Sequence, residues 1–367
     1  MGKNIVICCD GTKNDVTTDS TNVLRFFRSL VRKDEQIAYY DCGVGTISDP
    51  TKLTRIGRYL NSGIDMAIGH SVRDNVCRAY RFLCQCYSPG DKIYLIGFSR
   101  GAYTVRALAG MIHMLGILRR ELQELDRLAW SVYSDDRGIL STSARFGSAN
   151  RFKNSFSIGE DSRIEFVGVW DTVNACGWIW DPFMVPYTSN NSSINHIRHA
   201  LSIDERRALF QPNLFRPKSE DQHKSFKQIW FAGSHGDVGG GYPERESGLA
   251  KVSLEWMYNE ANACGCLLDR NQTAHFLGQV KAGENAKPDI LDKSHESTKG
   301  LLYNLLEFVP RKHWNSGTQK LGWHIPNFYR RRAIQEQSQF HLSVKDKLEK
   351  DSDYKPTNLP REINYCT

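Results

Sequence analysis

The feature that most constrains this chain is a glycine-flanked serine placed directly after an apolar run. Lys92–Ile96 has the composition of a buried strand, Gly97-Phe98-Ser99-Arg100-Gly101 follows at once, and Ala102–Leu115 has the apolar spacing of a helix. A strand, a tight turn and a helix in this order form a nucleophile elbow. Side chains two positions on either side of the serine would collide with the strand and the helix, which explains both glycines. The sequence therefore predicts Ser99 as a nucleophile.

The same turn predicts where a developing negative charge is held. The backbone N–H of Arg100 lies at the start of the predicted helix, where it can stabilise an oxyanion. Asp10, Gly11 and Thr12 follow the first apolar run, Asn4–Cys9, at the carboxyl edge of the expected sheet, where ligands bind in open α/β folds. We expect Gly11 or Thr12 to supply a second N–H donor, with Asp10 as an additional site residue. A plain Asx-type turn without a catalytic part is the alternative.

A nucleophilic serine needs a base and an acid that orients the base. In this kind of fold the acid and then the histidine follow the serine along the chain, in loops after later strands. Asp171 comes directly after an apolar strand, and His235 follows another strand in a glycine-rich loop. We predict Asp171 as the acid and His235 as the base. Asp237 is the alternative acid or a cap of the loop, and His341 is the reserve base.

Strands and helices alternate through much of the chain. Expected strands are Asn4–Cys9, Gln36–Tyr40, Lys92–Ile96, Ile164–Val169 and Gln228–Ala232, and expected helices are Thr21–Val31, Asn61–Cys86, Ala102–Leu115 and Gly248–Leu268. This alternation predicts an α/β fold, α/β-hydrolase-like, with a mostly parallel central sheet and helices on both faces.

The candidate residues are spread so widely that no cut would leave a working site. We therefore expect a single domain over 1–367. Polar stretches predict cap insertions around 119–163 and 178–227, and the tail predicts a helical extension over 285–367.

The charge balance is mildly basic. Lys and Arg total 48 against 41 for Asp and Glu, a net +7 that falls short of a dedicated nucleic-acid binder, so we expect no nucleic-acid partner. Part of this charge lies in Arg330–Arg332, where we expect contact with an anionic membrane surface. Arg100 and Arg106, near the elbow, are candidates to attract an anionic head group. The composition leaves the oligomeric state open.

Two features of the sequence, its cysteines and its lack of targeting signals, indicate the cellular compartment and whether a metal site is to be expected. No apolar run approaches about 20 residues and the N-terminus lacks signal-peptide organisation, which predicts a cytoplasmic protein and leaves secretion open. The ten cysteines are then expected to be free thiols. Two C-x-C pairs, Cys84/Cys86 and Cys264/Cys266, sit in apolar helical patterns and are interpreted as buried hydrophobes. We expect no metal and no cofactor.

Five ordered motifs together resemble one family. They are C-C-D-G-T-x-N (Cys8–Asn14), G-D-x-I-Y-L-x-G-F-S-R-G-A (Gly90–Ala102), V-W-D-T-V (Val169–Val173), H-x-D-V-G-G-G-Y (His235–Tyr242), and H-x-S-V with Y-x-P-x-N-L-P (His341–Pro360). The chain is similar, from about Asn4 to Pro360, to the uncharacterised α/β-hydrolase family that includes the catalytic domains of type VI secretion phospholipase effectors. The resemblance implies an esterase or lipase with a Ser99–Asp171–His235 triad.

The residues and the resemblance lead to the same expectation for function. We expect a serine hydrolase that forms an acyl-enzyme from carboxylic esters, with a small-molecule or lipid ester as substrate and phospholipase, lipase or esterase activity. An acyltransferase or thioesterase with the same triad is the first alternative. A non-catalytic protein that binds anionic lipid or nucleic acid is the second, because the tail interleaves basic and aromatic residues.

Overall fold

The structure is a computed structural model that places most of the chain. It describes residues 2–11, 20–43, 64–135, 142–159, 162–173, 177–178, 181–182, 185–207, 210–219, 222–280, 285–297, 311–315, 320–324 and 329–367. Thr12, one of the expected oxyanion donors, falls outside these ranges. Among the helices within them, none is long and apolar enough to cross a membrane.

A central sheet of eight strands organises the fold. The strands are β1 (Asn4–Cys9), β2 (Gln36–Asp41), β3 (Lys92–Phe98), β4 (Ile164–Trp170), β7 (Ile194–Ser202), β8 (Ser225–Phe231), β11 (Gln339–His341) and β12 (Asn364–Cys366). They lie in the order β12-β11-β8-β7-β4-β3-β1-β2, and every neighbouring pair is parallel. The predicted α/β class with a parallel central sheet is therefore confirmed.

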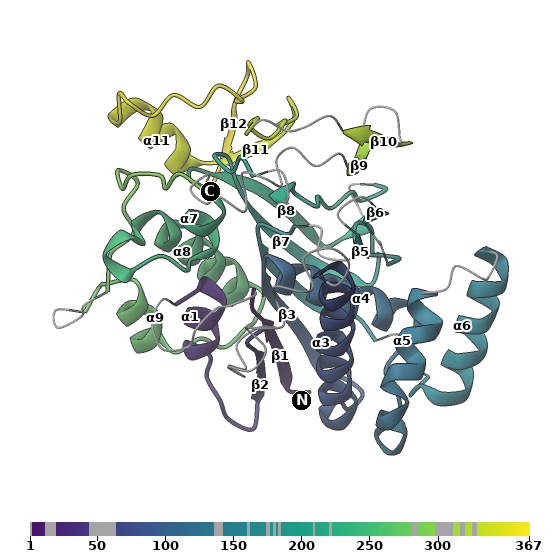
Figure 1. The fold of residues 1–367 in the computed structure, drawn as a ribbon. Helices are drawn as coiled ribbons and strands as arrows, with labels where there is room; N and C mark the ends of the chain where they lie inside the picture. The colour runs from purple at the N-terminus through teal and green to yellow at the C-terminus, as the bar shows by residue number, and fades with distance from the viewer. Residues whose placement is uncertain are drawn as a thin grey trace, which may run out of the picture.

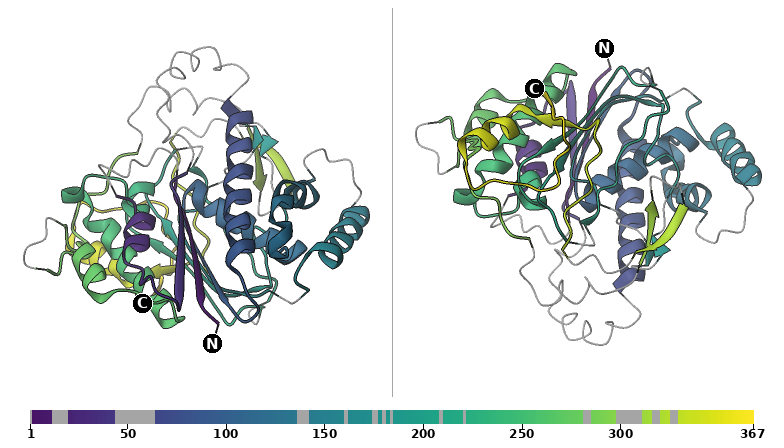
Figure 2. Two further views of the ribbon diagram at one scale, coloured as in Figure 1. Left: turned by 90° about the horizontal axis from the view of Figure 1, so that it is seen from below. Right: turned by 90° about the horizontal axis from the view of Figure 1, so that it is seen from above.

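Helices cover both faces of this sheet (Figure 1, Figure 2). On one face lie α3 (Ile64–Cys86), α4 (Arg100–Leu115), α5 (Asp126–Ser134) and α6 (Thr142–Phe156), and on the other α1 (Asn22–Arg28), α8 (Gly248–Ala263) and α9 (Arg270–Phe276). β1 shows why both layers form. Ile5 and Ile7 join the core under the first layer, whereas Val6 and Cys8 join the core under the second. A strand buried on both faces appears in the sequence as a continuous apolar run.

The stretch 178–227 differs from the insertion that we expected. It contains β7, a central strand between β4 and β8, together with one strand of the short hairpin β5 (Gly177–Trp178) and β6 (Asp181–Pro182). The apolar pattern of β7 is interrupted by His196 and Arg198. Arg198 is nevertheless buried, because it forms an ion pair with Glu260 of α8. The partner lies far away in sequence, so the polar residues concealed a core strand.

The expected helical extension over 285–367 is also only partly helical. It holds α11 (Leu342–Lys350), but β11 and β12 of the same stretch extend the central sheet beside β8. A second hairpin, β9 (Arg311–Asn315) with β10 (Lys320–His324), precedes them. β11 and β12 have three residues each, too few to give a periodic signal.

The stretch 119–163 forms helices, η1 (Arg120–Leu125), α5 and α6. Trp130 of α5 and Phe152 of α6 are buried in the same core as α3 and α4. This segment, which we expected to be a cap over the functional edge, extends the helical layer beside α4 (Figure 1).

Candidate active site

Ser99 lies on the turn between β3 and α4 in a backbone conformation that is uncommon for a residue with a side chain. Its φ is 57° and its ψ is −120°. Such positive φ values cost free energy and cluster at functional sites. Its own N–H donates a 3.1 Å hydrogen bond to the carbonyl of Trp170, at the end of the neighbouring strand β4. The serine is thus held where two parallel strands end.

The two glycines of the turn leave no room for side chains. A Cβ on Gly97 would lie 2.7 Å from the Cα of Ala102, and a Cβ on Gly101 would lie 2.0 Å from the carbonyl oxygen of Cys9. The first turn of α4 therefore packs directly on the end of β1. This contact brings the backbone N–H of Arg100, at the positive end of a 16-residue helix, to the carboxyl edge of the sheet.

Asp10 and Gly11 occupy that same edge but are tied to each other. The N–H of Gly11 donates to Asp10 Oδ1 at 2.7 Å, and Asp10 Oδ2 accepts from the Tyr40 hydroxyl at 2.8 Å and from the Thr21 hydroxyl. The Gly11 amide that we expected to face an oxyanion is thus already bonded. Asp10 is buried and joins β1, β2 and the start of α1.

The second and third candidate residues meet at hydrogen-bonding distance. Asp171 follows β4, and His235 opens the short helix α7 (His235–Gly239) that follows β8. His235 Nδ1 and Asp171 Oδ2 are 2.5 Å apart, and both side chains are buried. Phe98 and Trp170 are the last paired residues of the adjacent strands β3 and β4. Ser99 and Asp171 are the residues that follow them, so they leave the sheet side by side. Residues far apart in sequence therefore gather at one edge.

Arg332, which we did not predict as a site residue, binds the Asp171 carboxylate. Arg332 Nη1 donates to Asp171 Oδ1 at 2.6 Å and Nη2 donates to Asp171 Oδ2 at 2.9 Å. The N–H of Ser202 gives Oδ1 a further bond at 3.0 Å. Burial alone would raise the pKa of Asp171, but the Arg332 charge and the bond to His235 hold it well below its usual range. The carboxylate is therefore ionised although it is fully buried.

A second acidic residue, Glu205, supports the backbone of His235. Its Oε2 accepts from the His235 N–H at 3.3 Å and from Arg207 Nη2 at 2.8 Å. Burial by itself raises the pKa of this carboxyl, but the Arg207 guanidinium and the more distant Arg332 lower it to about 2. Nothing in the local sequence pattern had marked Glu205, since its contact to His235 depends on how the strands are ordered.

Asp237, the alternative acid, serves the helix that carries His235. Its Oδ2 accepts from the Ser234 N–H at 2.8 Å, which completes a capping box. Its Oδ1 lies 2.6 Å from His295 Nδ1, and the His295 ring stacks on Tyr242. The segment that we expected to be a glycine-rich loop is a capped helical turn, and Asp171 is the acid that reaches the His235 imidazole.

His341, the reserve base, lies at a different place. It caps α11, its Nδ1 accepts from the Ser343 N–H at 3.3 Å, and its ring stacks on Phe231. Burial lowers the pKa of this imidazole to about 4. His341 therefore stabilises the start of α11.

Several arginines that we expected to be available at the surface are engaged within the protein. Arg106 is 1% exposed, donates to the backbone carbonyl of Thr188 at 2.6 Å and lies over the Phe215 ring, so it is structural. Burial lowers its pKa to about 9. Within Arg330–Arg332, Arg331 pairs with Asp204 at 2.6 Å and Arg332 is 2% exposed. Arg331 and Arg332 are therefore engaged within the protein and only Arg330 of the cluster is exposed, so contact with an anionic surface stays a prediction that would rest on Arg330.

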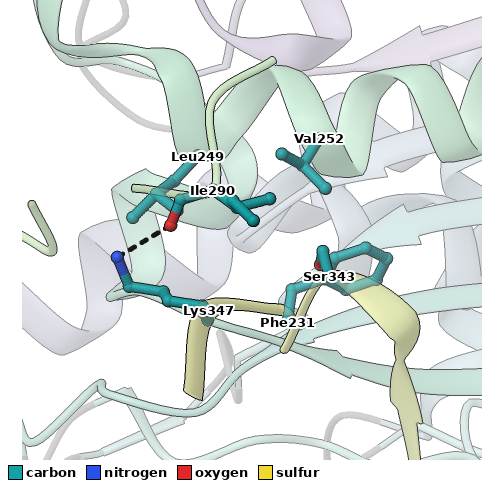
Figure 3. A pocket seen from close by; sticks show the side chains of 7 residues that line it. Phe231, Leu249, Val252, Ile290, Ser343 and Lys347 are labelled. Carbon is teal, nitrogen blue, oxygen red and sulfur yellow. Dashed lines mark hydrogen bonds between the residues drawn. The ribbon is translucent and has the colours of Figure 1, made fainter. Parts of the chain in front are cut away.

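A small cavity lies elsewhere, between the end of β8, α8 and α11 (Figure 3). It is lined by Phe231, Ala232, Leu249, Val252, Ile290, Ser343 and Lys347. Lys347 Nζ donates to the Ile290 carbonyl at 2.8 Å. Ser99, Asp171 and His235 are not among its lining residues.

The cysteine pairs are partly buried. Cys84 and Cys266 are each 1% exposed, and their partners Cys86 and Cys264 are half-buried. Burial raises the pKa of the Cys84 thiol to about 12. Within the described ranges, no three His, Cys, Asp or Glu side chains are grouped so as to ligate a metal ion.

Comparison with known proteins identifies the family. Residues 3–260 match the family described as T6SS, Phospholipase effector Tle1-like, catalytic domain. The chain belongs to this family. The resemblance noted from the five motifs is thereby confirmed, and membership of the Tle1-like family supports a lipase- or phospholipase-type hydrolase. Arg332 lies outside the matched residues.

Relatives of this Tle1-like chain are distant or longer. It is 36% identical to Uncharacterized protein YEL023C of Saccharomyces cerevisiae over 230 residues, and this matched region covers 59% of the chain. The match spans only 33% of the length of that yeast protein. Among solved structures, an uncharacterized protein from Pseudomonas aeruginosa has a TM-score of 0.44 at 19% identity, covering 74% of this chain and 47% of its own. The Tle1 effector bound to the VgrG spike has a TM-score of 0.36 at 17% identity, and the match covers 68% of this chain and 52% of the effector.

Proposed function

We propose that this chain is a serine hydrolase of carboxylic esters, with Ser99 as nucleophile, His235 as general base and Asp171 as the acid that orients the base. The observation that carries the proposal is the 2.5 Å contact between His235 Nδ1 and Asp171 Oδ2, beside a serine in a strained turn. A carboxylate on Nδ1 fixes the tautomer whose Nε2 is free to accept a proton.

The reaction proceeds in two halves. Ser99 Oγ attacks the ester carbonyl carbon while His235 Nε2 takes the hydroxyl proton, and the C=O π electrons move to the carbonyl oxygen. When the tetrahedral intermediate collapses, the C–O bond to the alcohol breaks and His235 returns the proton to the departing oxygen. Water then attacks the acyl-enzyme by the same route, which releases the carboxylic acid and regenerates Ser99.

The oxyanion needs donors that are in place before the reaction starts. We assign the first to the backbone N–H of Arg100, since it starts α4 and adds the positive end of that helix. Gly11 would have to exchange its bond to Asp10 for the oxyanion. Thr12 remains the other candidate for the second donor.

The substrate class follows from the family and the site together. The family description names phospholipase effectors, so we propose lipid or acyl esters as substrates. The triad itself would also serve small esters and thioesters. The rings of Phe98 and Phe210 both contact the His235 imidazole, and apolar neighbours of this kind are consistent with a substrate that carries an acyl chain.

A labelling and turnover experiment tests the proposal. A fluorophosphonate probe should label the wild-type protein and fail to label Ser99→Ala. A matched control, Ser131→Ala, removes an exposed serine hydroxyl on α5 and should label as the wild type does. Hydrolysis of nitrophenyl esters of increasing chain length, beside phospholipid vesicles, then gives the preferred acyl chain. Equal labelling of wild type and Ser99→Ala would refute Ser99 as the nucleophile.

A further inference from the structure

The Arg332–Asp171 contact is built more elaborately than a simple ion pair. The guanidinium meets both carboxylate oxygens at 2.6 and 2.9 Å, in the fork geometry that arginine alone offers. Arg332 Nη1 also donates to the Ser202 carbonyl at 3.0 Å and lies 2.6 Å from the Ser202 hydroxyl. Nη2 donates to the carbonyl of Phe210. The carboxylate has little freedom to rotate.

The backbone around Arg332 is anchored as firmly as its side chain. Asn358 Nδ2 donates to the Arg332 carbonyl at 3.1 Å and to the Ile203 carbonyl at 3.0 Å. The adjacent Arg331 holds Asp204, whose Oδ2 also accepts from the Tyr354 hydroxyl at 2.9 Å. Arg331 and Arg332 are thus fixed to residues 203–204, which directly follow β7.

We propose that Arg332 is a positioning residue of the hydrolase: its guanidinium holds the Asp171 carboxylate in the orientation in which it receives His235 Nδ1–H. This inference rests on the proposed function. It also makes the segment that follows the family match part of the active site, since Arg332 lies beyond residue 260.

The charge of Arg332 has a second effect, on the imidazole. With neutral His235, the buried Asp171 and Arg332 charges cancel. An ionised Asp171 without Arg332 would stabilise the imidazolium more strongly, because no nearby cation would oppose it. Removing the arginine charge should therefore move the acid limb of kcat/KM, which reports the base in the free enzyme, to higher pH.

Other charged groups near His235 set the background for this shift. Glu205 accepts the backbone N–H of His235, and Arg207 lies over the Phe210 ring that packs on the imidazole. Asp237 lies in α7 with His235, and it is paired with His295. None of these is changed in the variants below, so a displaced acid limb reports the Arg332–Asp171 pair.

The first experiment separates the effect of the Arg332 charge from the effect of its two-pronged hydrogen bonding. Arg332→Gln should lower kcat about 100-fold with little change in KM, because the carboxylate loses its orientation. Arg332→Lys keeps the charge but not the fork, so its acid limb should stay near that of the wild type while kcat remains reduced. Arg330→Gln removes an exposed charge two residues away and should match the wild type in kcat and pH profile. A wild-type kcat and acid limb in Arg332→Gln would overturn the proposal.

The second experiment is a double-mutant cycle. If Arg332 acts through Asp171, then Arg332→Gln added to Asp171→Asn should cost little further activity, measured as the rate of fluorophosphonate labelling. Losses that multiply would show an independent role and overturn the proposal. The double variant carries neither charge of the pair, whereas Asp171→Asn leaves the Arg332 cation buried without its counter-charge and Arg332→Gln leaves the carboxylate so. Urea unfolding of Asp171→Asn and of the double variant is therefore measured beside the labelling rates, so that a loss of labelling is separated from a loss of folding.

The two proposals fail in different ways. A wild-type protein that hydrolyses no ester and is not labelled at Ser99 would remove both. A wild-type protein that is labelled at Ser99, with Arg332→Gln labelled at the same rate, would remove only the role of Arg332.

Discussion

The ring of Phe98 lies against the imidazole of His235, with centroids 4.5 Å apart and planes inclined by 31°. Phe98 is the residue before Ser99, so this contact joins the turn that carries the serine to the helix that carries the histidine. The ring of Phe210 also contacts this imidazole, in an edge-on arrangement with centroids 4.8 Å apart. Two aromatic rings and one carboxylate therefore fix how the imidazole is aimed.

Replacing Phe98 tests this contact. Phe98→Leu should lower kcat about tenfold through a looser imidazole and cost roughly 1–2 kcal/mol of unfolding free energy. Phe152→Leu is the matched control, because Phe152 is also 5% exposed but lies in α6. Its stability should fall similarly while kcat stays at the wild-type value. Equal kcat values for the two variants, from steady-state hydrolysis with stability from urea unfolding, would speak against the contact's role in aiming His235.

The close packing of α4 on β1 gives a steric prediction. Gly101→Ala places a Cβ 2.0 Å from the Cys9 carbonyl oxygen, so it should destabilise the protein by several kcal/mol, on the order of 3. Gly147→Ala, in α6, meets nothing closer than 3.7 Å and should stabilise by about 0.5–1 kcal/mol. Thermal unfolding of both variants measures the contrast. A Gly101→Ala protein as stable as the wild type would mean that α4 can move away from β1 without cost.

The two candidate acids should respond differently to the loss of one charge. Asp171→Asn should lower kcat by roughly 10⁴-fold, since the neutral amide no longer fixes the proton on His235 Nδ1. Asp237→Asn weakens the capping box and the bond to His295, so it should cost about 1 kcal/mol of stability and far less activity. Steady-state kinetics and denaturant unfolding separate the two effects. The reverse order of kcat losses would transfer the acid role to Asp237.

The lowered pKa of Glu205 predicts that the folded protein loses stability as the pH becomes acidic. Its pKa is about 2 in the folded protein against 4.5 for the free side chain, so its contribution is complete above pH 4.5 and is lost as pH falls towards 2. Glu205→Gln should therefore cost on the order of 3 kcal/mol at pH 7, a penalty that shrinks steadily between pH 4.5 and 2. Urea unfolding over this pH range gives the curve.

A control keeps that result specific. Glu121→Gln changes a carboxylate that is 70% exposed, and it should alter stability by less than about 0.5 kcal/mol at any of these pH values. A Glu205→Gln penalty that is the same at pH 7 and pH 3 would mean that the carboxylate charge is not what stabilises the loop before His235.

The sequence was most informative where a signal was local. β1 and β3 are continuous apolar runs because both faces of a parallel sheet are covered. Ser99 follows β3 directly, Asp171 follows the largely apolar β4, and His235 follows β8, in which residues 229–231 form the buried apolar part. β7 escaped prediction because Arg198 looks like a surface residue until Glu260 is brought beside it by folding.

The supporting residues of the site could not be predicted for a related reason. Arg332 belongs to a run of three arginines that resembles a surface patch, and Glu205 has no motif around it. Their roles arise from contacts with Asp171 and His235, which depend on the order of strands in the sheet. Sequence reasoning therefore found the proposed reacting groups and missed the charges that hold them.

The 161-residue separation between Asp171 and Arg332 has a consequence for biosynthesis. A ribosome delivers Ser99, Asp171 and His235 well before it delivers the arginine that neutralises the buried carboxylate. Until then the nascent chain carries an unbalanced charge at the carboxyl edge of its sheet, and burying that charge without a partner opposes closure of the region. The site is therefore completed last during translation, and a chain released before Arg332 should be a target for proteolysis rather than a partially active hydrolase.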